Sequence, residues 1–289
     1  MSPNLAGALL MIASMACFTF NDAAIKATGG AVPLFQLMFL RGVITSLLIL
    51  VLARRLGAIQ FRISRQDWKL IALRSIAEVA ASYFFLTALL NMPLGNLTAI
   101  LQVLPLALTL GASLVFSDPL GWRRLLAIVV GFCGVLLIVK PGVDGFTIWS
   151  VYGLIAVLCV TVRDLSTRRL SADAPSMTVT LVSSLSVMAA AGLASLSAPW
   201  APVSPPSGSL IVAASFFILG GYYFSVRVMR VGDISFVAPF RYTGLVWALL
   251  LGWLIFDDWP GPATLLGAAI VVSTGLFTLY RERKLRSVA

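Results

Sequence analysis

The chain has 289 residues, of which 60% are hydrophobic and only 11% are charged, and its net charge at neutral pH is +10. Soluble domains carry about 25% charged residues, so this composition predicts a chain that is mostly surrounded by lipid. The Lys and Arg residues fall in short clusters between apolar runs and form no basic stripe with aromatics, which argues against a nucleic-acid-binding protein.

Ten apolar runs have the length of about 20 residues that a membrane-spanning helix needs. The first five are Asn4 to Ala27, Pro33 to Arg54, Leu70 to Asn91, Leu94 to Phe116 and Trp122 to Lys140. The second five are Trp149 to Leu170, Ser176 to Ala198, Leu210 to Arg230, Asp233 to Phe256 and Pro262 to Arg281. Connections as short as "MPLG" and "VGD" predict antiparallel neighbours. The first run is too long for a signal-peptide core and lacks a positive leader, so we expect it to stay in the mature protein.

The loop charges predict the orientation. One side collects fifteen cations: Arg54, Arg55, Arg62, Arg65, Lys69, Arg123, Arg124, Arg168, Arg169, Arg227, Arg230, Arg281, Arg283, Lys284 and Arg286. The other side has two, Lys26 and Lys140. Because cytoplasmic loops carry the excess of Lys and Arg, we expect a bacterial inner-membrane protein with both termini in the cytoplasm.

Two halves of the chain echo each other. Thr19-x-x-Asp22 returns as Thr161-x-x-Asp164, and the residues that match Lys26 and Pro33 are found at the same offset of 142 positions. Near the fourth span, "FSDPLGWRRLLA" resembles "FDDWPGPATLLG", 140 positions later. This pattern predicts two five-helix repeats, at residues 1–146 and 147–289. Since five is odd, the second repeat is inserted upside down, as in many secondary transporters.

The ten spans, the two repeats and the proline- and acid-marked end of each fourth span resemble the drug/metabolite transporter superfamily, EamA type, over essentially the whole chain. More specifically, the chain resembles the bacterial amino-acid exporters of the YddG type, which handle aromatic amino acids and related solutes. The resemblance implies a cavity lined by the first, third and fourth helices of each repeat, and alternating access by rocking of the halves. The predicted fold is an all-α integral membrane protein with ten transmembrane helices in two inverted-topology repeats.

A charge inside the bilayer costs about 2.5–3.5 kcal/mol on insertion scales, so each one needs a partner or a wet cavity. Arg74 and Glu78 lie four residues apart on one predicted helix and can pair. Arg241 has the same depth as Glu78, so an inter-repeat contact between these two is also possible. For Asp22 and Arg41, at a shared depth near the outer face, the sequence favours interfacial snorkelling.

Polar and aromatic residues on the cavity helices are the candidate substrate contacts, because aromatic walls with a few hydrogen-bonding groups suit a flat organic solute. They are Asn21, Glu78, Tyr83, Gln102, Arg163, Tyr222, Tyr223, Arg241 and Tyr242. A guanidinium such as that of Arg241 can bind a carboxylate with two parallel hydrogen bonds. The candidates for proton coupling or gating are Asp22, Glu78, Asp164, Pro105 and Pro239, the prolines because each permits a kink in its helix.

These features favour a secondary transporter that exports aromatic or bulky apolar amino acids and related metabolites. Efflux of drugs or cationic metabolites and a non-transporting membrane scaffold are the alternatives. The chain has no histidine, no GxSxG nucleophile and no P-loop, so we expect no enzyme, no metal and no cofactor. The expected partners are a small solute and the lipid bilayer. Gly131, Gly134, Gly267 and Gly275 predict close helix packing or a dimer face, so monomer and homodimer both stay open.

Overall fold

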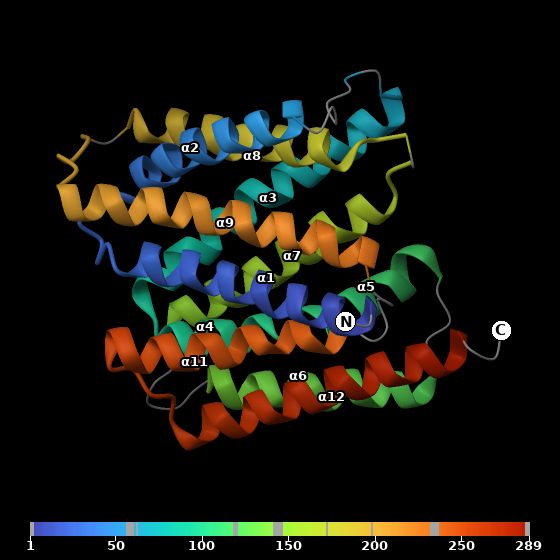
Figure 1. The fold of residues 1–289 in the computed structure, drawn as a ribbon. Helices are drawn as coiled ribbons and strands as arrows, with labels where there is room; N and C mark the ends of the chain where they lie inside the picture. The colour runs from blue at the N-terminus through green and yellow to red at the C-terminus, as the bar shows by residue number, and fades with distance from the viewer. Residues whose placement is uncertain are drawn as a thin grey trace.

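The computed structural model describes residues 3–55, 61, 63–117, 121–140, 147–171, 173–197, 199–231 and 237–286. In these ranges every regular element is a helix (Figure 1). The first half contains α1 (Pro3–Lys26), α2 (Leu34–Arg55), α3 (Arg65–Asn91), α4 (Leu94–Leu101), α5 (Leu104–Phe116) and α6 (Trp122–Val139). The second half contains α7 (Ile148–Arg168), α8 (Ser176–Ser195), α9 (Pro205–Val231), η1 (Ala238–Tyr242), α11 (Thr243–Phe256) and α12 (Pro262–Arg286).

Nine stretches of the described residues are long and apolar enough to cross a membrane, with α4 and α5 counted as one stretch and η1 and α11 as another. The tenth, α6, has 18 residues, of which Leu125–Val139 form its shorter apolar part. At 1.5 Å per residue it still extends over about 27 Å, close to the thickness of the hydrocarbon core. The predicted all-helical membrane fold is therefore confirmed.

Several predicted boundaries were wrong for identifiable reasons. Helix α3 begins five residues earlier than predicted because the Ser64 side chain caps it, accepting a 3.0 Å hydrogen bond from the Asp67 backbone N–H. Helix α9 begins at Pro205, five residues before the predicted start, because proline suits the first turn of a helix. The start of the ninth predicted span, Asp233 to Phe236, lies outside the described residues.

The fourth span of each half is interrupted. In the first half the α-helix stops at Leu101, and α5 begins at Leu104 with Pro105 in its first turn. In the second half the corresponding segment is the short 3-10 helix η1, which contains Pro239 and leads into α11. Proline lacks a backbone N–H and disfavours a continuous α-helix, which explains both interruptions. The gating role of these two prolines stays a prediction.

The helices of the two halves pair with each other across the bundle. Helix α1 packs on α9, and α3 packs on α7. Each of these contacts joins the first helix of one half to the third helix of the other half. Helix α2 packs on α8 and α6 on α12, which are each other's counterparts. In Figure 1, α1 runs away from the end of the bundle that carries the termini while α7 runs toward it. This two-fold pattern has the form of inverted repeats; the repeat boundaries at residues 146 and 147 remain a prediction.

The glycines of α6 and α12 serve packing within the chain. A Cβ on Gly134 would lie 2.9 Å from the Gly267 carbonyl oxygen, and a Cβ on Gly267 would collide with the Gly134 carbonyl. Gly131 faces Leu106 and Thr274, and Gly275 faces the Tyr242 ring. Small residues allow two backbones to approach this closely. Of the two readings left open for these glycines, the structure supports close helix packing.

Candidate functional site

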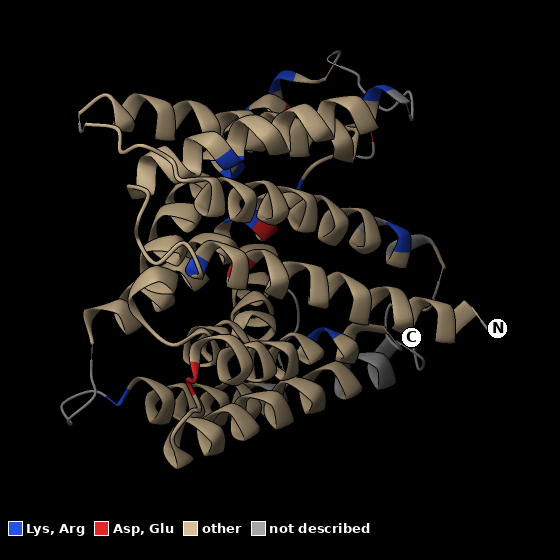
Figure 2. Ribbon diagram, turned by 60° about the vertical axis from the view of Figure 1, so that its left-hand side comes forward, with Lys and Arg blue, Asp and Glu red and all other residues tan. Residues whose placement is uncertain are grey.

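A cavity of about 440 Å³ lies midway along the helices between the two halves. It is lined by residues of α1, α2, α3, α4, α5, α7, α9 and η1, and it has the size typical of small-molecule sites. Figure 2 shows charged residues inside the bundle, away from both helix ends. Apolar side chains form much of the wall: Met11, Met15, Phe18, Phe85, Leu86 and Ile218. The cavity combines charges with flat apolar surfaces.

Arg163 is the centre of an ion-pair network at the cavity. Its guanidinium lies 3.2 Å from a carboxylate oxygen of Glu78 and 2.7 Å from one of Asp164. The expected contacts of Glu78 with Arg74 or Arg241 are not the ones the described residues form. Arg74 donates instead to the hydroxyls of Thr167, at 2.8 Å, and Ser183. Glu78 is thus neutralised from the opposite half of the molecule.

A second polar group joins α1 to α2. The Asn21 amide nitrogen donates to an Asp22 carboxylate oxygen at 2.8 Å, and the amide oxygen accepts from the Arg41 guanidinium at 3.2 Å. All three residues line the cavity. The snorkelling that the sequence favoured for Asp22 and Arg41 is wrong, because both side chains face the centre of the protein. Arg41 is absent from the predicted substrate contacts, although a lone arginine within a long apolar run is itself a signal of a wet site.

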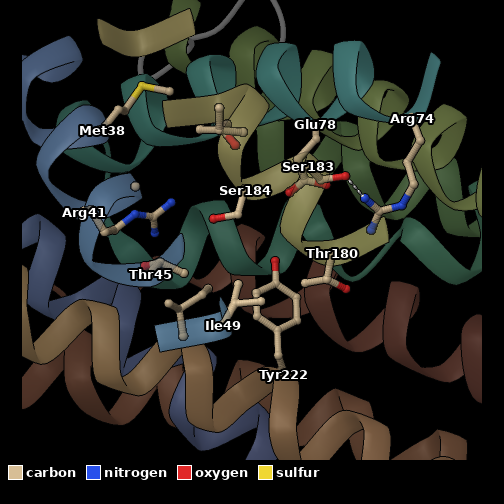
Figure 3. A pocket seen from close by; sticks show the side chains of 14 residues that line it. Met38, Arg41, Thr45, Ile49, Arg74, Glu78, Thr180, Ser183, Ser184 and Tyr222 are labelled. Atoms are coloured by element: carbon tan, nitrogen blue, oxygen red, sulfur yellow. Dashed lines mark hydrogen bonds between the residues drawn. The ribbon is translucent and has the colours of Figure 1, made fainter. Parts of the chain in front are cut away.

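A smaller pocket of about 60 Å³ adjoins the cavity and shares Arg41, Glu78 and Tyr222 with it. We call it the side pocket. Its polar lining comes from α2, α3, α8 and α9, and Figure 3 shows the Arg41 guanidinium and the Tyr222 hydroxyl directed toward the same space. The hydroxyls of Thr45, Ser82, Thr180, Ser183 and Ser184 complete the polar lining. Five hydroxyls and two arginines, Arg41 and Arg74, against the one acid Glu78 make the pocket suited to an anionic group.

The four predicted tyrosines lie in different places. Tyr222 lines the cavity and packs edge-on against Phe18, with ring centroids 5.5 Å apart. Tyr223, its neighbour, is 39% exposed on the outside of the bundle. Tyr83 stacks on Phe35 and lines an apolar groove between α2, α3 and α8. The structure therefore brings only Tyr222 of these three to the cavity.

Tyr242 is buried against Gly275, and its hydroxyl is a buried oxygen without a hydrogen-bond partner in the described structure. Its neighbour Arg241 does line the cavity. Gln102 is buried at the interruption between α4 and α5, where Leu101 and Leu104 reach the cavity. Within the described residues, no three His, Cys, Asp or Glu side chains gather as they would around a metal ion.

The chain is similar to known transporters over almost its whole length. Residues 5–140 match the model of the EamA-like transporter family. A riboflavin transporter of Vibrio cholerae is 30% identical, with 98% of this chain and 96% of the relative aligned. An S-adenosylmethionine uptake transporter of Rickettsia prowazekii is 24% identical over 96% of this chain and 94% of the relative. The pseudopaline exporter CntI of Pseudomonas aeruginosa is 24% identical over 95% and 96%.

The fold is similar to that of a solved crystal structure, with a TM-score of 0.66 and 18% sequence identity. The alignment covers 96% of this chain and 98% of that chain. At this level of identity the similarity concerns the fold alone. The narrower likeness to YddG-type exporters remains a prediction, because the named relatives carry S-adenosylmethionine, pseudopaline and riboflavin.

Proposed function

Because the chain belongs to the EamA-like transporter family and is a membrane transporter, not an enzyme, we propose that it exports amino acids with aromatic or bulky apolar side chains. The observation that carries this proposal is the composition of the central cavity. Phe18, Phe85 and Tyr222 offer flat surfaces to an aromatic side chain, while Arg41 and Asp22 offer both signs of charge. Sites for flat organic solutes combine such walls with a few placed polar groups.

In the proposed mechanism the solute binds midway along the helices, and the two halves rock to open one side of the membrane and then the other. Inverted repeats around a central site support such movement, since each half can occupy the position of the other. The chain has no P-loop for ATP, so the solute gradient or a coupled ion drives transport. We place both termini in the cytoplasm of a bacterial cell from the distribution of Lys and Arg.

Efflux of cations is the weaker alternative. A site for a lipophilic cation needs an acidic group that is free to pair with the solute. Glu78, the acid best placed for that role, already lies 3.2 Å from Arg163. The cavity also carries three arginines, Arg41, Arg163 and Arg241, against the two acids Asp22 and Glu78. Arg163 is held by Glu78 and Asp164, and the other two arginines, Arg41 and Arg241, outnumber the remaining acid, Asp22, which disfavours a cationic solute.

Riboflavin is a second candidate solute, because the Vibrio cholerae relative that carries it is 30% identical to this chain. Its flat ring system suits the same aromatic walls. The two candidates differ in charge, since an amino acid is a zwitterion and riboflavin is not. Competition between them can therefore decide which solute the cavity prefers.

The test is transport by the purified protein in lipid vesicles. Vesicles loaded with labelled tryptophan should lose the label faster with the protein than without it, and unlabelled aromatic amino acids should compete. The same assay should include riboflavin and a lipophilic cation as competitors. Competition by riboflavin alone would replace amino acids with the second candidate. A protein that moves none of these solutes would contradict the proposal and favour a scaffold.

A further inference from the structure

The charged groups of the cavity differ in how fully they are paired. Arg163 is occupied on two sides, by Glu78 and by Asp164. Arg41 and Asp22, by contrast, each contact the Asn21 amide, and the ion pairs of the described residues do not include them. Two opposite charges thus face the cavity without a direct ion pair between them. Inside a membrane such an arrangement is costly unless a ligand or water completes it.

The Asn21 amide keeps these two charges apart. Asn21 is only 2% exposed, so its position is fixed by packing. It presents a donor to Asp22, at 2.8 Å, and an acceptor to Arg41, at 3.2 Å. An α-amino acid presents the same order of groups, because its ammonium donates hydrogen bonds and its carboxylate accepts them. These two groups are one bond further apart than the nitrogen and oxygen of an amide. Asp22 and Arg41 therefore offer an acceptor and a donor in the order that the head group of an amino acid needs.

We propose that Asp22 and Arg41 form a zwitterion clamp, in which Asp22 binds the ammonium group and Arg41 binds the carboxylate of an α-amino acid. Asn21 is the positioning residue of this clamp. The inference rests on the proposed function and narrows it, because a solute with only one of the two charges leaves the other protein charge unpaired. Charge-assisted hydrogen bonds are the strong ones, so the clamp selects for the complete zwitterion.

The side pocket provides room for the carboxylate beside Arg41. Thr45, on the next turn of α2, lines this pocket and is 7% exposed, and its hydroxyl oxygen is buried without a hydrogen-bond partner in the described structure. Native structures satisfy nearly all such buried groups. Tyr222 directs its hydroxyl to the same space (Figure 3). The Glu78 carboxylate also lines the pocket, but it is paired with Arg163, and the two arginines of the lining, Arg41 and Arg74, outnumber it, so the pocket keeps its preference for an anion.

The clamp makes Arg41, and not Arg241, the receiver of the carboxylate. Arg241 lines the cavity from η1, where the structure places no acid against it within the described residues. Arg241 can attract an anion, but it has no acid beside it, within the described residues, that could bind an ammonium group at the same time. Arg41 contacts the same amide group as Asp22 and can act together with it. This difference separates the two arginines experimentally.

The first experiment needs only the unmodified protein in lipid vesicles. Competition against labelled tryptophan is measured with tryptophan, with tryptamine, which lacks the carboxylate, and with N-acetyltryptophan, which lacks the ammonium charge. We expect each analogue to compete about tenfold or more weakly, the factor that corresponds to losing a charge-assisted hydrogen bond. If either analogue competes as well as tryptophan, the clamp is overturned although amino-acid transport stands.

The second experiment assigns the two charges. Arg41→Gln should remove the preference for tryptophan over tryptamine, and Asp22→Asn should remove the preference over N-acetyltryptophan. The matched controls Arg227→Gln and Asp173→Asn change exposed residues outside the cavity and should keep both preferences. If Arg241→Gln and not Arg41→Gln abolishes the first preference, the clamp is wrong. If the unmodified protein moves no amino acid, the proposed function fails before the clamp is tested.

Discussion

Helices α1 and α7 hold equivalent places in the two halves. Their shared motif, Thr-x-x-Asp, has the same local geometry at its threonine. Thr19 and Thr161 are both buried, and each donates its hydroxyl hydrogen to the carbonyl four residues earlier, at 2.9 and 2.8 Å. Such bonds satisfy a hydroxyl inside an apolar helix at little cost. The threonines therefore give no information about transport. They show a hydrogen bond that the two helices have in common.

The acids three residues later, Asp22 and Asp164, differ in the residue that precedes each of them. Asp22 follows an asparagine, whose neutral amide contacts its carboxylate at 2.8 Å. Asp164 follows an arginine, whose guanidinium contacts it at 2.7 Å. An amide leaves the charge of the acid in place, whereas a guanidinium cancels it. One difference, Asn21 against Arg163, thus leaves Asp22 on α1 outside the ion pairs of the described residues and pairs its counterpart on α7 with a cation.

The last residues of the two helices repeat the pattern of a cation over an aromatic ring. The Lys26 ammonium lies 5.4 Å from the centre of the Phe256 ring, and the Arg168 guanidinium lies 4.5 Å from that of Phe116. Both contacts join one half to the other, at opposite ends of the bundle. Alternating access requires that contacts between the halves break at whichever end opens. The two contacts are therefore sites at which the ends can be loosened separately.

The largest effect is expected from Arg163→Gln, which makes α7 resemble α1. Glu78 and Asp164 would then keep their charges near the middle of the membrane without the cation that pairs with both. Removing one partner of a buried ion pair costs about 3–5 kcal/mol. Thermal unfolding of the detergent-purified variant should show this loss, with Arg227→Gln as the exposed control. A stability equal to that of the control would mean that the network has no structural role.

The helices and their inverted pairing could be predicted from the sequence because they depend on properties of single residues. Apolar length gives the spans, and an odd number of spans per repeat gives the inversion. Even the interruptions at Pro105 and Pro239 follow from the chemistry of one residue type. Helix ends were predicted less well, since the capping of α3 by Ser64 is a contact between side chain and backbone.

The partners of the charged residues could not be predicted, because depth in the membrane does not fix direction around a helix. Glu78 shares its depth with Arg241 but faces Arg163 on α7. Tyr222 and Tyr223 are neighbours in sequence, yet one lines the cavity and the other is exposed. Arg41 was missed for the same reason: its depth suggested the interface, while its direction leads to the centre.

A smaller effect is expected from Asn21→Leu, which keeps the branched shape of the side chain but removes the amide between Asp22 and Arg41. Each charge loses the hydrogen bond that Asn21 provides, and a buried polar group left unpaired costs about 1–3 kcal/mol. We expect a loss of stability of about 2 kcal/mol and weaker binding of tryptophan. Binding is measured by competition in vesicles and stability by thermal unfolding. Unchanged tryptophan binding would show that the spacing set by Asn21 does not matter.

The next effect concerns the end of α1. The Lys26 ammonium donates to the carbonyl oxygens of Met92, at 2.8 Å, and Leu89, at 3.3 Å, in addition to its contact with Phe256. Lys26→Met keeps an unbranched side chain that is one atom shorter and removes these bonds. We expect a loss of about 1.5 kcal/mol, the low end for hydrogen bonds to a charged group. A cysteine introduced at Leu86, on the cavity wall, should react faster with a membrane-impermeant maleimide applied from outside.

The control for that experiment is the same cysteine in a protein with Lys140→Met, a cation that is predicted to lie on the same side of the membrane. Labelling there should stay at the level of the protein that carries the cysteine alone. Equal labelling in the Lys26→Met and Lys140→Met proteins would show that the contact at the end of α1 does not hold the outer end closed.

The smallest effect is expected from Arg168→Gln at the end of α7, because this contact has a second cation. The Arg169 guanidinium lies 5.2 Å from the centre of the same Phe116 ring and donates to the Val115 carbonyl at 3.3 Å. Losing one of two cations at a partly exposed ring costs about 0.5 kcal/mol. The double variant Arg168→Gln/Arg169→Gln should lose more than twice as much, since the ring then has neither. If Arg168→Gln alone destabilises the protein as much as Lys26→Met, the two ends are equivalent, and the divergence between α1 and α7 is confined to the middle of the membrane.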